Sequence, residues 1–76
     1  MSRPLRPIRP RRLVRVFERD GWTRKHQVGS HLTLTRVGAS RPVVIPMGKD
    51  VPVGIILKNM RTAGMSRRRL FELLDE

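Results

Sequence analysis

The sequence predicts an α+β fold in which helices cover one face of a three-stranded antiparallel sheet. Three observations predict it: an amphipathic stretch near the N-terminus, three short extended stretches separated by glycine turns, and two further amphipathic stretches toward the C-terminus. The expected order is α-β-β-β-α-α, with no internal repeat, and the strands form a meander because short turns join them. Since the chain has 76 residues, we expect one domain with a modest core.

The first predicted helix begins at Pro10 and ends just before Gly21. Proline suits the first turn of a helix, where its missing N–H is not needed, and glycine is common just after the last turn. Leu13, Val14 and Phe17 fall on one face, at spacings of i, i+1 and i+4. We expect this face to pack on the sheet, with arginines around the rest of the helix.

Three strands are expected after this helix, at residues 22–27, 31–36 and 41–46. The second strand alternates regularly, with Leu32 and Leu34 on one face and His31, Thr33 and Thr35 on the other. A Val-Gly-Ser turn separates the first two strands, and a Gly-Ala-Ser turn precedes the third. Prolines in the third strand predict that it lies near an edge or stays short.

Two further helices are expected at the C-terminus. Pro52 opens the first, which runs through Ala63 and is stopped by Gly64. Ser66 is the expected N-cap of the second, shorter helix. The run Arg67-Arg68-Arg69 follows it and opposes the helix dipole, whose positive end lies there.

The first ten residues follow an Arg-Pro-x pattern of period three. Three residues per turn is the repeat of polyproline II, so Arg3, Arg6 and Arg9 would share one edge suited to a phosphate backbone. The alternative is a disordered basic tail without fixed contacts, which is common at chain termini. We predict a flexible tail at residues 1–10 and a folded domain at residues 11–76.

The charge balance predicts a polyanionic partner. Lysine and arginine total 17 against 6 acids, which gives a net charge of +11, and the planar fork of arginine suits phosphate. Nucleic acid is therefore the leading partner, and an acidic protein is compatible with it as a second partner. A membrane surface ranks lower, because no basic amphipathic helix of useful length is found.

The residue types that are missing exclude several classes of protein. The sequence has no cysteine, which excludes disulfides, thiolate zinc sites and cysteine nucleophiles. A small domain without disulfides fits a reducing cytoplasm, and no apolar run approaches the roughly 18 residues of a membrane span. There is no glycine-rich phosphate loop, carboxylate pair or metal-spaced ligand set, so no metal or cofactor is expected.

His31 is the candidate catalytic residue. It follows Gly29 and Ser30, and it lies out of phase with Leu32 and Leu34, on the face opposite the core. An imidazole on a cationic surface suits RNA cleavage, because it can take the proton of a ribose 2′-hydroxyl, which then attacks the adjacent phosphate. Nearby arginines would stabilise the developing charge. The alternative interpretation is a solvated surface histidine.

His26 adds a possible second catalytic group. A two-residue turn at residues 28–29, or a four-residue turn, places His26 directly opposite His31, with Cβ atoms about 5 Å apart. The two imidazoles would then act as base and acid. An odd-length turn would undo this pairing, and the alternative is that His26 shares a face with Arg24 and only extends the basic surface.

The chain resembles the HicA toxins, also called the YcfA-like family, of bacterial HicAB toxin–antitoxin modules. The resemblance covers most of the chain, from Leu13 to Leu74, and rests on short motifs in the family's order. These motifs are Leu13-Val14-Arg15 through Phe17-Glu18 to Asp20-Gly21-Trp22, then Gln27-Val28-Gly29-Ser30-His31, then Val43 to Pro46, and finally Lys49, Pro52, Gly54, Ala63, Gly64 and Ser66.

This resemblance implies a fold like the double-stranded RNA-binding domain and a ribosome-independent mRNA endonuclease. It also implies a HicB-type antitoxin that blocks the active site. The active histidine of the family follows Gly-Ser and corresponds to His31. The sequence departs from the family at His26, where arginine is common, at Met47-Gly48, where a histidine often follows the third strand, and in its Arg-Pro tail.

Together these observations predict a cytoplasmic ribonuclease toxin that cleaves mRNA without a metal and is neutralised by an acidic HicB-type antitoxin. His31 is the predicted catalytic residue, and the predicted RNA-binding residues are Arg24, Lys25, His26, Ser30 and Lys49. The competing interpretation is a non-catalytic RNA-binding domain, which needs no histidine and fits the charge equally well. A DNA-binding protein is the third interpretation, and it predicts duplex binding that weakens steeply with salt.

Overall fold

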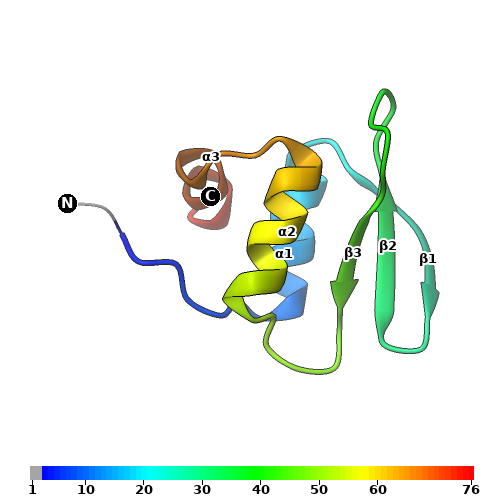
Figure 1. The fold of residues 1–76 in the computed structure, drawn as a ribbon, viewed down its shortest axis with the longest axis horizontal. Coiled ribbons are helices and arrows are strands. Elements are labelled where there is room, and N and C mark those ends of the chain that lie inside the picture. Colours follow the sequence, from blue (N-terminus) through cyan, green and yellow to red (C-terminus); the bar gives the residue numbers. More distant parts are fainter. Residues whose placement is uncertain (1–2) are drawn as a thin grey trace.

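The computed structural model describes residues 3–76. The elements are α1 (Pro10–Arg19), β1 (Thr23–Val28), β2 (His31–Thr35), β3 (Val43–Pro46), α2 (Val53–Ala63) and α3 (Arg67–Leu74). The strands form an antiparallel sheet in the order β1-β2-β3, and the helices lie together on one side of it (Figure 1). The predicted α+β class and element order are confirmed. Within residues 3–76, no helix has the length and apolarity needed to cross a membrane.

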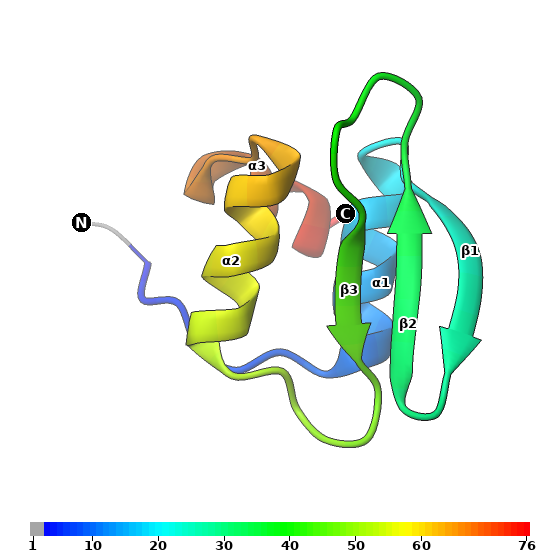
Figure 2. The same cartoon turned by 45° about the vertical axis from the view of Figure 1, so that its right-hand side comes forward.

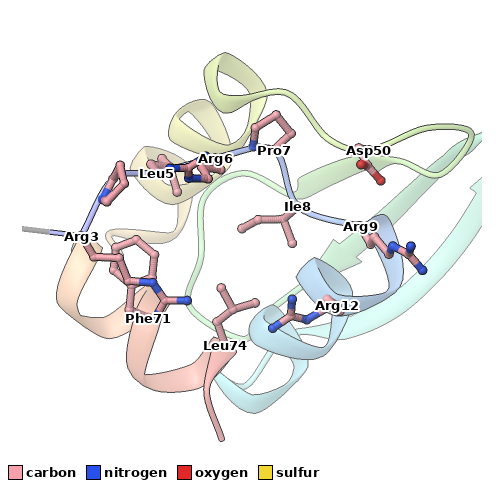
Figure 3. A pocket seen from close by; sticks show the side chains of 11 residues that line it. Arg3, Leu5, Arg6, Pro7, Ile8, Arg9, Arg12, Asp50, Phe71 and Leu74 are labelled. Carbon is pink, nitrogen blue, oxygen red and sulfur yellow. The ribbon is translucent and has the colours of Figure 1, made fainter.

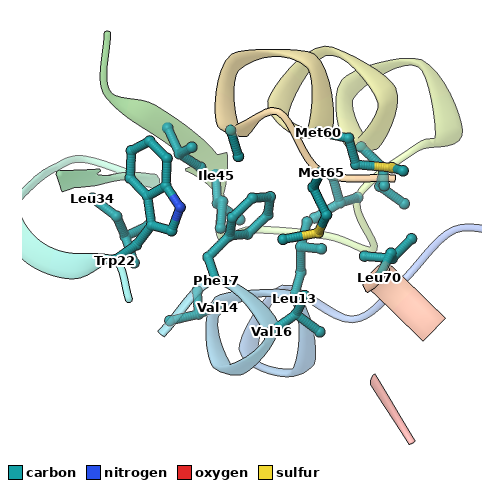
Figure 4. Packing of buried hydrophobic residues seen from close by; sticks show 14 of the residues in the cluster. Leu13, Val14, Val16, Phe17, Trp22, Leu34, Ile45, Met60, Met65 and Leu70 are labelled. Carbon is teal, nitrogen blue, oxygen red and sulfur yellow. The ribbon is translucent and has the colours of Figure 1, made fainter. Parts of the chain in front are cut away.

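The core is centred on α1, which contacts the sheet on one side and α3 on the other. Phe17 points toward Ile45 and meets Trp22 edge to face, with ring centroids 6.3 Å apart (Figure 4). Val16 is fully buried although it lay outside the predicted apolar face. Its burial follows from α3, because Val16 lies on the side of the helix where Leu70 of α3 packs (Figure 4). The buried face of α1 is therefore wider than a sheet alone requires.

The first hairpin carries a β-bulge in β1. Arg24 pairs with Leu34 and His26 pairs with Thr33, so Lys25 is the extra residue without a partner. Because side chains alternate along a strand, the extra residue reverses the phase of β1. Arg24 therefore lies on the side of Leu34 and faces the helices, whereas His26 lies beside Thr33 on the outer face.

The free edge of β3 is closed by a side chain of α2. The amide nitrogen of Asn59 donates to the carbonyl of Val44 at 3.0 Å, and the backbone N–H of Val44 donates to the amide oxygen at 3.4 Å. Asn59 is 4% exposed, and these two bonds satisfy it. The contact fixes α2 beside β3, where Figure 2 shows the two elements next to each other.

The N-terminal segment, residues 3–9, lies along the domain rather than away from it (Figure 3). Ile8 is 6% exposed, and its backbone pairs with Val51 through N–H to carbonyl bonds of 3.1 and 2.8 Å. Near the start of the segment, the Arg3 guanidinium lies 4.4 Å from the centre of the Phe71 ring and pairs with Asp75 at 2.6 Å. These contacts join the segment to α3 and to the loop before α2.

This placement differs from the expected tail without fixed contacts. The same period of three that aligns the arginines also aligns Leu5 and Ile8, so an extended segment presents one apolar edge to the domain. Leu5 is half-buried and Ile8 is a member of the core cluster. The first two residues of the predicted tail lie outside the described residues, and flexibility of residues 1–10 stays a prediction.

A cluster of polar side chains around Asp20 connects the end of α1 to its neighbours. The carboxylate of Asp20, at the end of α1, accepts from Arg36 at 3.0 Å, from Trp22 at 3.3 Å and from Arg69 at 3.4 Å. Arg36 also stacks over the Trp22 ring at 4.7 Å and donates to the carbonyl of Ala63 at 3.3 Å. One carboxylate therefore links α1, the end of β2 and the start of α3.

Candidate active site and basic groove

His31 is the first residue of β2 and lies on the outer face of the sheet. Its side chain is exposed, whereas Leu32 and Leu34 are buried, as the alternation of the strand predicts. Backbone pairing places it between Val28 of β1 and Pro46 of β3. The imidazole therefore lies at one end of the sheet and is accessible to a substrate from solvent.

A hollow of about 380 Å³ lies beside His31, between β3 and α2. Together with His31 it is lined by Arg41, Pro42, Val44, Pro46, Ile55, Lys58, Asn59 and Thr62. We name it the histidine pocket. Its walls are apolar where the prolines, Val44 and Ile55 lie, and its remaining lining groups are polar.

Two of these polar groups are already engaged. Asn59 is bound to β3, and the Thr62 hydroxyl donates to the carbonyl of Lys58 at 3.1 Å. This leaves the imidazole of His31 and the cations of Arg41 and Lys58, neither of which forms an ion pair within residues 3–76. The residues that line the pocket include no carboxylate. An imidazole beside two cations suits an anionic ligand such as a phosphodiester.

Arg41 and Lys58 were not among the residues predicted from the sequence. Arg41 lies in an irregular loop, for which periodicity gives no signal. A signal for Lys58 does exist in α2, because Ile55, Lys58 and Thr62 recur at i, i+3 and i+7 and so form one stripe. The prediction of this helix used only its apolar stripe, which packs in the core, and so did not identify the stripe that contains Lys58.

A second hollow, of about 730 Å³, lies at the other side of the hairpin. It is lined by Arg9, Pro10, Arg11, Arg15, Arg24, Gln27, Met47, Gly48, Lys49 and Asp50. We name it the basic groove. It is formed by the start of α1, the helix-facing side of β1 and the loop after β3, and its described lining has five cations and one carboxylate.

The basic groove adjoins a further hollow, of about 760 Å³, under the N-terminal segment. Arg9 and Asp50 line both hollows. The hollow under the N-terminal segment is also lined by Arg3, Arg6, Arg12, Phe71 and Leu74 (Figure 3). The cationic surface at the start of α1 is therefore continuous with the N-terminal segment.

Residues 10–65 match the family described as the HicA toxin of bacterial toxin–antitoxin systems. The chain belongs to the HicA toxin family. It is thus a toxin of a toxin–antitoxin pair, and the family implies an antitoxin partner. Among curated proteins, no match is found.

The part of this HicA-family toxin that matches the family runs from the start of α1 to just after α2. It includes the sheet and every residue that lines the histidine pocket. The N-terminal segment and α3 lie outside it. The contacts between these two elements therefore lie outside the matched residues.

The prediction that His26 lies directly opposite His31 is wrong. The turn consists of Gly29 and Ser30, one residue later than assumed, so His31 pairs with Val28. His26 pairs with Thr33 and is a diagonal neighbour of His31 on the same face, for which Cα atoms lie about 7–8 Å apart in regular sheets. The turn lies at residues 29–30 because the first residue of such a two-residue hairpin loop takes a positive φ, which glycine adopts easily. Gly29 has a φ of 58°, and the φ of Ser30 is negative.

The structure separates the five predicted RNA-binding residues. His26 lies on the outer face with His31, whereas Arg24 and Lys49 line the basic groove. Lys25 is exposed at the bulge and Ser30 is exposed in the turn. The prediction that His26 shares a face with Arg24 is wrong, because the bulge reverses the phase between them. Arg24 instead pairs with Glu18 of α1 at 3.2 Å.

The described residues offer no evident metal centre. Within residues 3–76, no group of three or more histidines, cysteines and acids lies close enough to hold a metal ion. The chemistry available in the histidine pocket is therefore that of imidazole, guanidinium and ammonium groups.

Proposed function

We propose that this HicA-family toxin is an endoribonuclease that cleaves mRNA with His31 as its general base and without a metal ion. The observation that carries the proposal is the place of His31, an exposed imidazole beside a pocket that contains Arg41 and Lys58 and no carboxylate. Family membership supports the toxin role, and the resemblance to HicA toxins supports mRNA as the substrate.

The reaction is a transesterification at phosphorus. His31 accepts the proton of a ribose 2′-hydroxyl, and the 2′-oxygen forms a bond to the adjacent phosphorus. The bond from phosphorus to the 5′-oxygen then breaks, and this oxygen takes a proton from water. The hydroxide that remains takes the proton from His31, which restores the base. The products are a 2′,3′-cyclic phosphate and a 5′-hydroxyl, with no change in oxidation state.

Arg41 and Lys58 stabilise the charge that builds on the phosphate oxygens in this step. Cations that are in place before the reaction lower its barrier, because they need no reorganisation as charge develops. A divalent ion in the same role is usually held by carboxylates, and the lining residues include none. This composition supports a mechanism that uses the two side-chain cations.

Neutralisation by an acidic HicB-type antitoxin is part of the same proposal. A toxin with a net charge of +11 attracts an acidic partner, and the outer face carries exposed apolar residues that a partner can cover. Val28 is 69% exposed and Val44 is 37% exposed, on either side of the β2 residues that include His31. A protein bound there excludes RNA from the histidine pocket.

Replacement of His31 by alanine tests the catalytic role. We expect the rate of cleavage of a labelled RNA to fall by about 10²–10⁴-fold, the usual contribution of a general base, and growth arrest on expression to be abolished. The fold should stay intact, since the exposed side chain leaves no cavity. His26→Ala is measured beside it, because it removes the other histidine from the same face of the sheet, and a loss of similar size there would show that both histidines take part.

Cleavage by His31→Ala within a few-fold of the unchanged protein would show that another group is the base. If the unchanged protein binds RNA tightly but does not cleave it, the competing interpretation of a non-catalytic RNA-binding domain is correct. Circular dichroism of each variant separates a loss of chemistry from a loss of structure.

A further inference from the structure

We propose that the basic groove is a second, non-catalytic site that binds the phosphate backbone of single-stranded RNA and anchors the substrate for His31. This inference rests on the proposed function, because it takes RNA as the substrate. It adds a binding site whose lining shares no residue with the histidine pocket, and it restricts the substrate to RNA that can bend around the end of the sheet.

The free cations of the groove are the first support. Arg24 is paired with Glu18, but Arg9, Arg11, Arg15 and Lys49 form no ion pair within residues 3–76. All of them line one hollow, and the described lining holds a single carboxylate to oppose them. Guanidinium groups bind phosphate oxygens through paired N–H donors and lose little hydration in doing so, so this lining suits a phosphodiester backbone.

The start of α1 is the second support. Its N-cap is Arg9, which makes no side-chain capping bond, and its first turn contains no acidic residue. Positive side chains at the positive end of a helix repel the helix dipole, so this arrangement lowers the stability of the free protein. A bound phosphate removes that repulsion and meets the unpaired N–H groups of the first turn.

The N-terminal segment holds one wall of the groove in place. Arg9 directly follows Ile8, whose pairing with Val51 fixes the backbone, so Arg9 is not at the end of a loose tail. Arg9 lies outside the part of the chain that matches the HicA family. The groove is therefore completed by a residue that lies just outside the matched part of the chain.

The geometry of the hairpin sets the path between the two sites. Gln27 in the groove pairs with Leu32, on the helix-facing side, while the neighbouring pair of Val28 and His31 faces outward. Pro46 pairs with His31, and the residues directly after it, 47–49, line the groove. The groove and the imidazole thus lie at the same end of the sheet but on opposite faces of it.

Only a flexible strand can follow this path. A nucleic-acid duplex is stiff, with a persistence length of about 50 nm for DNA, and cannot turn around the end of a single sheet at low cost. A single strand turns easily and exposes its phosphates on the way. We therefore expect cleavage in single-stranded segments, at a bond offset from the anchored phosphates, in spite of the family's resemblance to double-stranded RNA-binding domains.

The lining also favours RNA over a protein partner. Protein interfaces need a buried apolar centre, and Pro10 and Met47 are the main apolar residues that the groove offers. The histidine pocket, by contrast, has apolar walls, and exposed valines lie around it. The antitoxin therefore fits the outer face, and the groove remains for phosphates.

The test compares Arg11→Gln/Arg15→Gln with the matched control Arg61→Gln/Arg68→Gln, which removes the same charge from two residues that line neither the groove nor the histidine pocket. Binding is measured on the His31→Ala background, with a labelled single-stranded RNA of about 20 nucleotides, from about 50 to about 300 mM salt. Each lost phosphate contact reduces the slope of log affinity against log salt by about 0.7, so we expect a fall of about 1.4 for the groove variant. The control should keep the slope of the His31→Ala protein.

A cleavage assay completes the test, with His31 restored. The groove variant should cleave the long RNA with a raised KM and cleave a dinucleotide as fast as the unchanged protein. The same sequence held in a duplex should be a poor substrate for all forms. An unchanged salt slope, equal loss on the dinucleotide, or rapid cleavage of the duplex would overturn the proposal.

Two outcomes separate this proposal from the proposed function. If RNA binds with the expected slopes but no form cleaves it, the anchoring site stands and the nuclease assignment fails. If the groove variant binds antitoxin more weakly and RNA normally, the groove belongs to the protein partner, and the anchoring site is refuted whether or not cleavage is seen.

Discussion

Replacement of Ile8 by alanine tests whether the N-terminal segment is a structural part of the domain. Ile8 is 6% exposed and contributes to the core cluster, and its backbone pairs with Val51. Loss of buried methyl groups in an isoleucine-to-alanine change costs about 2–5 kcal/mol of unfolding free energy. Since Ile8 lies at the margin of the core and is still 6% exposed, its surroundings can partly fill the gap, and we expect the lower part of that range, about 2–3 kcal/mol.

Such a loss is large for a domain of this size, whose core supplies only about 3–5 kcal/mol of net stability. In domains of this length, 1 kcal/mol shifts Tm by about 4–8 °C, so Ile8→Ala should lower Tm by roughly 10–20 °C. Thermal and urea unfolding followed by circular dichroism measure both quantities. Arg6→Ala is the control, because Arg6 is exposed in the same segment and should change stability by less than about 0.5 kcal/mol.

The opposite result would refute the reasoning. If Ile8→Ala unfolds at the same temperature as Arg6→Ala, the segment adds nothing to the core and behaves as the flexible tail that the sequence predicts. Arg9 would then lose its fixed position, and the anchoring site would lose one wall. The stability measurement therefore bears on the function as well as on the fold.

Two further predictions follow from the proposed mechanism and partner. Cleavage should persist in EDTA and should give 2′,3′-cyclic phosphate and 5′-hydroxyl ends; loss of activity in EDTA with rescue by magnesium, or 5′-phosphate ends, would contradict it. The antitoxin should stabilise the toxin by about 4 kcal/mol at a thousandfold excess over Kd, and it should slow cleavage as it is titrated. Binding that neither raises Tm nor slows cleavage would place the partner elsewhere on the toxin.

The sequence was sufficient to predict the fold and the exposure of His31. Both depend on strong alternation or periodicity: Leu32 and Leu34 define the two faces of β2, and Phe17 with its neighbours defines the buried face of α1. Proline, glycine and serine at the helix ends gave usable boundaries. Where apolar burial dictates the phase of an element, one sequence is enough to find it.

The register of the first hairpin could not be predicted in the same way. All six residues of β1 are exposed, so no buried face fixes the phase of the strand, and the bulge at Lys25 leaves no mark in a polar stretch. The position of His26 depended on both the turn and the bulge. A weakly specified edge strand is where a pairing argument from sequence has the least physical support.

The position of the N-terminal segment and the composition of the histidine pocket are two other features that could not be predicted from the sequence. The arginines of the segment suggested a solvated tail, while the apolar residues between them, Leu5 and Ile8, decide its place by burial. In the pocket, Arg41 and Lys58 meet His31 only through tertiary packing of the loop and α2 against β3. Neither is near His31 in the sequence, so spacing carries no information about their meeting.

The hairpin gives a physical reason why inhibition and RNA anchoring can be separate events in this toxin. Because Lys25 has no partner, Arg24 faces the helices and His26 faces outward, so one hairpin presents functional side chains on both faces of the sheet. If both proposals hold, an antitoxin on the outer face closes the histidine pocket while the basic groove, across the sheet, stays open to phosphates. RNA that is anchored there in the complex is cleaved as soon as the antitoxin leaves. Loss of the antitoxin, rather than the encounter with RNA, then sets the time at which cleavage begins.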